Sequence, residues 1–240
     1  MRGDRAVVTG SARGIGRHVA VELARAGATV TVLDVLDTTD TVELVTAEGG
    51  SATGGRVDVT DRAAVTAAVA GAGGDDADLD ILVTAAGVYG DSPTLDELTE
   101  AELDTVLSVN LAGTLWCVQA ALPLLRAGDG GRVVCIGSVA GKIGGVLAGP
   151  HYAASKGGVH AVVRWLARTQ AAAGVTANGI APGAVDTDMI TGRGYEPDYC
   201  PLGRLATPQE IAGVAAFLAS PAASYMTGTV IDVNGGYFMG

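Results

Sequence analysis

Aromatic side chains, charged side chains and cysteines are all scarce in this 240-residue chain. Aromatic residues make up 4% of it and charged residues 17%, whereas hydrophobic residues make up 48%. The low charge argues against a disordered chain. With few aromatics, the core must consist mainly of Ala, Val, Leu and Ile, which suits buried parallel strands beneath Ala-rich helices. The length is that of one domain, and we expect residues 1–240 to form it.

Acidic side chains outnumber basic side chains, and the net charge is −11. A chain this acidic repels nucleic acid and anionic lipid, so we expect neither as a partner. The three cysteines, Cys117, Cys135 and Cys200, are odd in number, far apart and in no CxxC arrangement. This pattern predicts no disulfide framework and no metal site, and it favours a reducing compartment.

Long apolar segments are missing as well. The N-terminal stretch "MRGDRAVVTGSARGIG" has no apolar region before its first strand, so no secretory signal is predicted. No uninterrupted apolar run reaches the length of a membrane-spanning helix. We therefore expect a soluble cytoplasmic protein.

Short β-branched runs alternate with longer helical patterns along the whole chain. The predicted strands are 5–10, 29–34, 55–59, 80–87, 131–137, 175–183 and 228–236. The predicted helices are 15–26, 38–48, 61–71, 95–126, 152–173 and 208–219. Thr60 and Thr207 are expected to cap two of these helices. Strands that alternate with helices indicate βαβ units, and hence an α/β, doubly wound parallel sheet of about seven strands with helices on both faces.

A glycine-rich turn, "VVTGSARGIGR", follows the first predicted strand and opens a helix. Its glycines, Gly10, Gly14 and Gly16, have the spacing GxxxGxG. Glycine permits tight-turn dihedrals and lets backbone N–H groups approach a pyrophosphate at a helix N-terminus. A ligand-free turn of the same composition is the alternative reading. The position between strand one and an amphipathic helix favours dinucleotide binding.

Acidic residues end the next two predicted strands. Asp34 can accept both hydroxyls of the adenosine ribose, which favours NAD and repels the 2′-phosphate of NADP. Arg13, in the glycine turn, argues the other way unless it pairs with Asp34 or lies on the adenine. Asp58 can accept from the adenine amino group, or it can be an ordinary turn residue.

The stretch "HYAASKGGVHA" places Tyr152 and Lys156 one helical turn apart, on one face of a helix. A free phenol titrates near about 10, and a general acid/base at neutral pH needs a pKa closer to about 7. An adjacent ammonium and a positive nicotinamide ring both favour the phenolate. Ser138 ends the preceding strand, and we expect it to converge with Tyr152 at the carboxyl edge of the sheet. A solvated helix face, or a packed Tyr beside a snorkelling Lys, would explain the pair without chemistry.

Taken together, these segments resemble the short-chain dehydrogenase/reductase family, in its compact single-domain branch with a Rossmann-type sheet. The resemblance spans nearly the whole chain. Its motifs are "TGSARGIG" (9–16), "DVTD" (58–61), "TAAG" (84–87), "SVNLAG" (108–113), "GSVAG" (137–141), "YAASK" (152–156), "APGAVDTDM" (181–189) and "DVNGG" (232–236).

The resemblance implies a role for each matching residue. Tyr152 would exchange the proton with the reacting oxygen, Lys156 would hold the nicotinamide ribose and lower the Tyr pKa, and Ser138 would orient the substrate oxygen. Asn110 would hold a water that links Lys156 to solvent, although it could instead only kink its helix. The contacts implied with the cofactor are those of Gly10, Arg13, Gly14, Ile15, Gly16, Asp34, Asp58, Val59, Ala85, Ala86, Gly87, Tyr152, Lys156, Pro182, Gly183, Val185 and Thr187.

Fewer residues in the sequence can be assigned to substrate binding than to cofactor binding. A substrate lid is expected around 188–203, and it looks short for the family. Its Tyr195 and Tyr199 can line the pocket or only anchor the loop. His151 is placed near the substrate entrance rather than in the role of a base. Thr84 stands where the family usually has Asn.

These observations predict an NAD(P)-dependent oxidoreductase that interconverts a ketone and a secondary alcohol, with NAD favoured. A 3-oxoacyl-thioester (acyl-carrier-protein) reductase or polyketide ketoreductase that uses NADPH is the alternative. A non-catalytic cofactor sensor and an epimerase or dehydratase on the same fold fit less well, because the Asn–Ser–Tyr–Lys set is complete and no large C-terminal region follows. The family resemblance also implies a homotetramer or homodimer.

Overall fold

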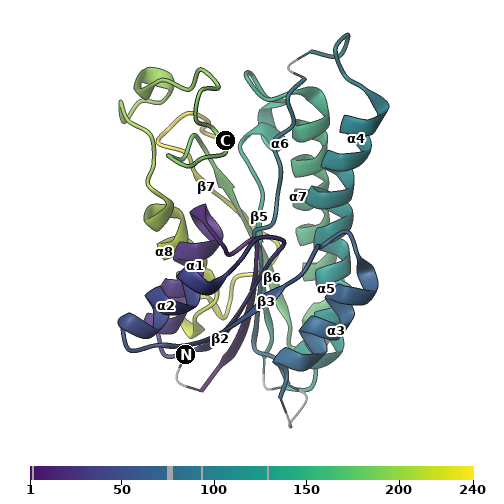
Figure 1. Ribbon diagram of the computed structural model, residues 1–240, viewed down its shortest axis with the longest axis vertical. Coiled ribbons are helices and arrows are strands. Elements are labelled where there is room, and N and C mark those ends of the chain that lie inside the picture. The colour runs from purple at the N-terminus through teal and green to yellow at the C-terminus, as the bar shows by residue number, and fades with distance from the viewer. Residues whose placement is uncertain (2, 75–77, 93, 129) are drawn as a thin grey trace.

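Seven parallel strands form one sheet at the centre of the protein (Figure 1). This computed structural model describes residues 1, 3–74, 78–92, 94–128 and 130–240. The strand order is β3-β2-β1-β4-β5-β6-β7, and the α/β fold with helices on both faces is confirmed. The strands are β1 (Arg5–Thr9), β2 (Thr29–Asp34), β3 (Ser51–Arg56), β4 (Ile81–Thr84), β5 (Arg132–Ile136), β6 (Thr176–Pro182) and β7 (Val230–Val233).

The central strands are buried because the helices cover both faces of the sheet. Ala6 of β1 lies in register with Val30 of β2 on one side and Ile81 of β4 on the other. Side chains alternate between the faces along a strand. Val8 therefore packs under α1 and α8, and Val7 packs under α3, α5 and α7. This burial on both faces explains the continuous apolar runs of the sequence.

The helices form two layers, with α1, α2 and α8 on one face and α3, α4, α5 and α7 on the other (Figure 1). The α-helices are α1 (Gly14–Arg25), α2 (Thr39–Ala47), α3 (Arg62–Ala72), α4 (Glu100–Leu107), α5 (Gly113–Leu125), α6 (Ala140–Ile143), α7 (Pro150–Gln170) and α8 (Pro208–Leu218). Shorter turns are the π-helix η1 (Ser108–Ala112) and the 3-10 helices η2 (Ala171–Ala173), η3 (Pro197–Tyr199) and η4 (Pro221–Ala223). The four-residue α6 was not predicted from the sequence.

The third strand differs from the sequence prediction of 55–59. β3 pairs with β2 from Ser51 opposite Thr29 to Arg56 opposite Asp34, so the strand ends before Val57. The β-branched run that suggested a strand lies beyond this pairing. Tertiary pairing with β2 overrides the weak strand propensity of the Ser-Ala-Thr-Gly-Gly stretch. Asp58 consequently stands in the turn after the strand.

The predicted helix 95–126 begins later, at Glu100, and carries a π-helix at its middle. Thr99 caps its start by accepting from the Glu102 N–H. The described helix Glu100–Leu125 is long and apolar enough, by length and composition, to cross a membrane. It packs on α3 and α7, as an apolar helix does in the core of a folded domain.

Two helix starts show how side-chain caps set the boundaries. Asp61, not the expected Thr60, caps α3 by accepting from the N–H groups of Ala63 and Ala64. Thr207 caps α8 as expected, in a reciprocal capping box with Glu210 and with Pro208 in the first turn. α8 packs against α1, so this cap also supports the helix that opens at the glycine turn.

We expect Thr207→Ala to lower the free energy of unfolding by about 1 kcal/mol, because the Glu210 N–H loses the hydroxyl that caps it. Urea denaturation measures the change. Thr66→Ala, at an exposed position inside α3, is the control and should change stability by less than about 0.5 kcal/mol. Equal effects of the two substitutions would contradict the capping role.

Candidate functional site

A cavity of about 410 Å³ opens at the carboxyl ends of the strands. The strand order reverses between β1 and β4, and ligands of doubly wound sheets bind at such a switch point. All the residues predicted to touch the cofactor line this one cavity. They are Gly10, Arg13, Gly14, Ile15, Gly16, Asp34, Asp58, Val59, Ala85, Ala86, Gly87, Tyr152, Lys156, Pro182, Gly183, Val185 and Thr187.

Close backbone packing explains two of the glycines in the first turn. A Cβ on Gly10 would lie 2.4 Å from the Ala86 nitrogen, and a Cβ on Gly16 would lie 2.1 Å from the Gly10 oxygen. Gly14 serves differently. It has φ +57°, and its Cβ would project toward the Thr187 methyl group, 3.6 Å away. A side chain at Gly14 would therefore narrow the channel between the turn and Thr187.

The N-terminus of α1 faces this channel and offers backbone donors. Arg13 occupies the N-cap position, and among the described residues no side chain caps the helix there. The N–H groups of a first helical turn then need another acceptor, and the positive end of the helix dipole favours an anion. The turn therefore fits the pyrophosphate of a dinucleotide.

Asp34 lies at the rim of the cavity with its carboxylate held in place. One oxygen accepts from the Ala12 N–H at 2.9 Å, and the other accepts from the Leu36 N–H at 3.0 Å. Arg13 does not pair with Asp34. Its guanidinium lies 3.1 Å from Asp188, across the cavity. The negative charge at the end of β2 is therefore not neutralised by the arginine of the glycine turn.

Asp58 also lines the cavity, and it is a turn residue. Its carboxylate accepts from the Thr60 N–H at 2.9 Å and from the Thr60 hydroxyl at 2.8 Å. These bonds form the turn that leads into α3. The structure confirms Asp58 as a turn residue, and the contact with the adenine amino group stays a prediction.

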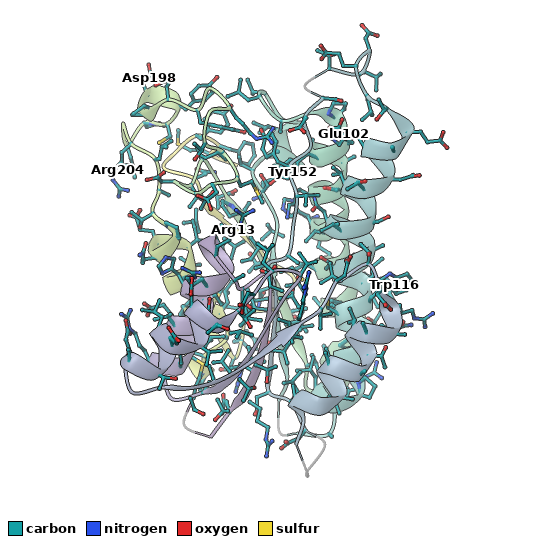
Figure 2. All side chains as sticks on the ribbon, viewed as in Figure 1. Arg13, Glu102, Trp116, Tyr152, Asp198 and Arg204 are labelled. Atoms are coloured by element: carbon teal, nitrogen blue, oxygen red, sulfur yellow. The ribbon has the colours of Figure 1, made fainter. Side chains whose placement is uncertain are left out.

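Tyr152 and Ser138 converge on the cavity from different elements. Ser138 follows β5, and its hydroxyl accepts from the Ala140 N–H at 3.1 Å. Tyr152 lies in the first turns of α7 and is only 7% exposed. In Figure 2 it lies at the upper edge of the sheet, with Arg13 below it and Glu102 toward α4. Burial raises the pKa of Tyr152 to about 12, although a hydrogen bond with Ser138 opposes the rise.

This direction is opposite to the lowered pKa expected from a neighbouring Lys156. The Lys156 ammonium is buried and donates to the Ile136 carbonyl at 3.0 Å, and it lies 5.8 Å from the centre of the Tyr152 ring. Burial also lowers the pKa of Lys156, to about 8. Loss of hydration disfavours the charged form of both groups, and at this separation the ammonium does not outweigh it.

Asn110 is completely buried inside the π-helix η1, behind the cavity rather than on its wall. Its side chain bridges the backbone of Val88, accepting from the N–H at 2.8 Å and donating to the carbonyl at 2.9 Å. The amide also donates to the Ser155 hydroxyl at 3.0 Å. A Cβ on Gly87 would lie 3.3 Å from the Asn110 carboxamide oxygen and 3.4 Å from the Lys156 nitrogen. Asn110 therefore stands in an irregular turn of the helix and on the same side of Gly87 as Lys156, and the water expected between them stays a prediction.

His151, predicted near the substrate entrance, lies outside the cavity. Its ring is buried, with Nε2 3.2 Å from a carboxylate oxygen of Glu102 in α4. Glu102 also accepts from the Ser92 N–H at 2.8 Å, and from the Asp91 N–H and the Ser92 hydroxyl. Hydrogen bonds from Ser92, above all, lower the pKa of Glu102 to about 2. Glu102 thus joins α4 to the loop after β4 and to the start of α7.

Tyr195 and Tyr199 both line the cavity, together with two tyrosines that the sequence reasoning missed. Tyr89 follows β4, and its ring centre is 4.7 Å from that of Tyr152. Tyr237 lies in the C-terminal segment after β7. The signal in the sequence is the small number of aromatic residues, which makes each tyrosine outside the core a candidate for the site.

Comparisons with known proteins agree on one family. A family model described as enoyl-(acyl carrier protein) reductase matches residues 10–238. The chain is 38% identical over 238 residues to cis-4-hydroxycyclohexanecarboxylate dehydrogenase of Sinomonas cyclohexanicum, covering 97% of this chain and 95% of the relative. This chain belongs to the short-chain dehydrogenase/reductase family. It is an oxidoreductase of the kind that acts on CH–OH groups.

Other relatives differ in their named substrates and in their bound cofactors. The chain is 35% identical over 254 residues to a 3-oxoacyl-[acyl-carrier-protein] reductase of Vibrio harveyi, covering all of this chain and 99% of the relative. Carveol dehydrogenase from Mycobacterium avium, in complex with NAD, has a TM-score of 0.93 at 28% identity, covering 99% of this chain and 98% of that chain. A putative 2-deoxy-D-gluconate 3-dehydrogenase from Agrobacterium tumefaciens, with bound NADP, has a TM-score of 0.90 at 34% identity, covering 99% of this chain and 97% of that one.

We expect Glu102→Gln to flatten the acid dependence of stability. The folded-state pKa of Glu102, about 2, lies below its ordinary value of 4.5. The stabilisation is therefore fully present above that ordinary value and is lost as the pH falls through the folded-state pKa. Melting temperatures measured from neutral pH down to about pH 2 check this.

Glu43→Gln, at an exposed position in α2, is the matched control for Glu102→Gln. The Glu102 variant should be less stable than the control at neutral pH, and the difference should shrink in acid. A difference that stays constant with pH would contradict the role assigned to the Glu102 carboxylate.

Proposed function

We propose that this protein is an NAD-dependent dehydrogenase that interconverts a secondary alcohol and a ketone by hydride transfer. The observation that carries the proposal is the convergence of Ser138, Tyr152 and Lys156 on the same cavity that the glycine turn and Asp34 line. The bound nicotinamide ring would supply the hydride acceptor or donor. A cytoplasmic location and a homodimeric or homotetrameric assembly are part of the proposal.

The proton chemistry falls to Tyr152. Oxidation of an alcohol removes a hydride from the carbinol carbon and a proton from the hydroxyl group, and reduction of a ketone reverses both. Tyr152 Oη would accept that proton in oxidation and return it in reduction. The Ser138 hydroxyl would hold the substrate oxygen beside it. The positive charge of an oxidised nicotinamide, next to Lys156, would favour the phenolate against the effect of burial.

Asp34 supports NAD as the cofactor. Two backbone N–H groups hold its carboxylate at the end of β2, where the adenosine ribose of a dinucleotide lies in such sheets. A 2′-phosphate there would meet this negative charge, and the arginine of the glycine turn, Arg13, pairs with Asp188 instead of Asp34. The lid at 188–203 would cover the nicotinamide end, directly after Thr187.

A 3-oxoacyl-thioester reductase that uses NADPH is the second candidate, because the chain is similar over its whole length to such an enzyme of Vibrio harveyi. A clear NADPH preference together with turnover of 3-oxoacyl thioesters would favour it over the dehydrogenase reading.

We expect Tyr152→Phe to lower kcat/KM by about 10²- to 10⁴-fold while NADH still binds, because the ring packing is kept and only the acid/base hydroxyl is lost. NADH absorbance against a panel of ketones, alcohols and 3-oxoacyl thioesters gives the rates, and a fluorescence titration gives the binding. Tyr225→Phe, at a fully exposed position, is the control. Full turnover by the Tyr152 variant would reject the proton-transfer role.

We expect Asp34→Ser to raise the ratio of kcat/KM with NADP to that with NAD by about tenfold or more, because like-charge repulsion of the 2′-phosphate is removed. Asp58→Asn removes a charge from the same cavity and should shift the ratio much less. An NADP preference in the unmodified protein, or an equal shift in both variants, would refute the assignment to Asp34.

A further inference from the structure

Tyrosines are concentrated at the substrate end of the cavity. The chain has six tyrosines, and five of them, Tyr89, Tyr152, Tyr195, Tyr199 and Tyr237, line this one cavity. We call these five side chains the tyrosine wall, and we propose that this wall selects an uncharged secondary alcohol or ketone whose carbon skeleton is a ring. The inference rests on the proposed dehydrogenase function and names the class of substrate for it.

The five rings form a continuous series of contacts from the reacting group outward. Tyr152 lies 4.7 Å from Tyr89 between ring centres, and Tyr89 lies 6.3 Å from Tyr195 in an edge-to-face arrangement. Tyr195 lies 5.8 Å from Tyr199, and Tyr199 lies 6.2 Å from Tyr237. The tyrosines come from the loop after β4, from α7, from the lid and from the C-terminal segment. A molecule that places its oxygen at Tyr152 therefore has aromatic surface beside the rest of its skeleton.

Ion pairs and hydrogen bonds hold the segments that carry these rings. The Arg193 guanidinium of the lid donates to the Gly90 carbonyl at 2.7 Å and pairs with Asp91 at 2.8 Å. It also lies 4.7 Å from the Tyr89 ring centre. The Tyr89 and Tyr195 hydroxyls hydrogen bond to each other across the same junction. The tyrosine wall is thus organised before a substrate arrives, which lowers the entropic cost of binding.

Apolar side chains and an acidic one also line the substrate end of the cavity. Val146, Leu147, Ile190 and Leu205 line the cavity there, and Glu196 lies in the lid beside Tyr195. Among the described lining residues the cations are Arg13 and Lys156. Arg13 pairs with Asp188, and Lys156 is buried against the Ile136 carbonyl. A substrate carboxylate or phosphate would therefore find no unpaired cation among the described residues that line the cavity.

Flat aromatic faces favour a compact ring over a flexible chain. A saturated or aromatic ring presents a broad apolar face to tyrosine, and its few rotatable bonds leave little conformational entropy to lose. An open-chain alcohol with the same number of carbon atoms buries a similar area only after its rotatable bonds are fixed, and this costs conformational entropy. Ring shape and absence of charge are the two properties that this wall recognises.

The test compares kcat/KM, with NAD, for cyclohexanol, for the acyclic 2-hexanol and for 4-hydroxycyclohexanecarboxylate. We expect cyclohexanol to exceed each of the other two by about tenfold. Calorimetric titration of the enzyme–NADH complex with cyclohexanol and with 2-hexanol measures the same preference as binding, independently of turnover.

Two substitutions assign the preference to the wall. Tyr195→Leu and Tyr199→Leu should each bring the ratio of cyclohexanol to 2-hexanol close to one while 2-hexanol is still oxidised. Tyr225→Leu, at the exposed tyrosine outside the cavity, should leave the ratio unchanged. Circular dichroism establishes that each variant is folded, and the two lid positions test the wall separately.

Turnover that favours 2-hexanol or the carboxylate would overturn the inference and leave the dehydrogenase function standing. A ring preference that survives both lid substitutions would also overturn it. Absence of NAD-dependent turnover with every alcohol and ketone would instead reject the proposed function, and the inference with it.

Discussion

The close contact between the first βα turn and the end of β4 is the constraint on which the site depends. The Gly10 backbone lies so near Ala86 that a side chain at position 10 would overlap the backbone there. Gly16 is pressed equally closely against Gly10, which seats the start of α1 over the switch point between β1 and β4. With these segments in contact, the backbone donors of α1, the carboxylate of Asp34 and the residues after β4 and β5 all border one cavity. Larger residues in the turn would separate the two halves of the binding edge.

A second layer of contacts lies behind the cavity and supports the segments whose side chains line it. Asn110 braces Val88 and Ser155 from the π-helix, and Glu102 joins Ser92 to His151. Neither side chain lines the cavity. Together they support the loop that carries Tyr89 and the helix that carries Tyr152. A π-helix within a long α-helix costs regular hydrogen bonding, and here it places a buried amide where the neighbouring backbone needs a partner.

Burial and charge compete at the Tyr152–Lys156 pair. One helical turn of spacing suggested that the ammonium would stabilise the phenolate. In the folded chain both groups are buried, the lysine bonds to a strand carbonyl, and burial moves the two pKa values toward the neutral forms. Spacing along a helix brings side chains to one face, whereas the balance of hydration and charge depends on everything packed around them.

The sequence by itself determined the order of strands and helices, the parallel doubly wound sheet and the residues at the ends of the strands, because these follow from local periodicity, turn chemistry and the geometry of βαβ units. Gly10, Asp34 and Ser138 stand where a strand gives way to a helix, and Tyr152 stands one turn before Lys156 on a helix face, so local patterns brought these residues forward and the family resemblance supplied their roles. Only the tertiary structure decided the register of β3, the burial of His151 against Glu102, the pairing of Arg13 with Asp188 and the gathering of five tyrosines. Each of these joins segments far apart in the chain. Long-range packing sets such contacts, and no local pattern encodes them.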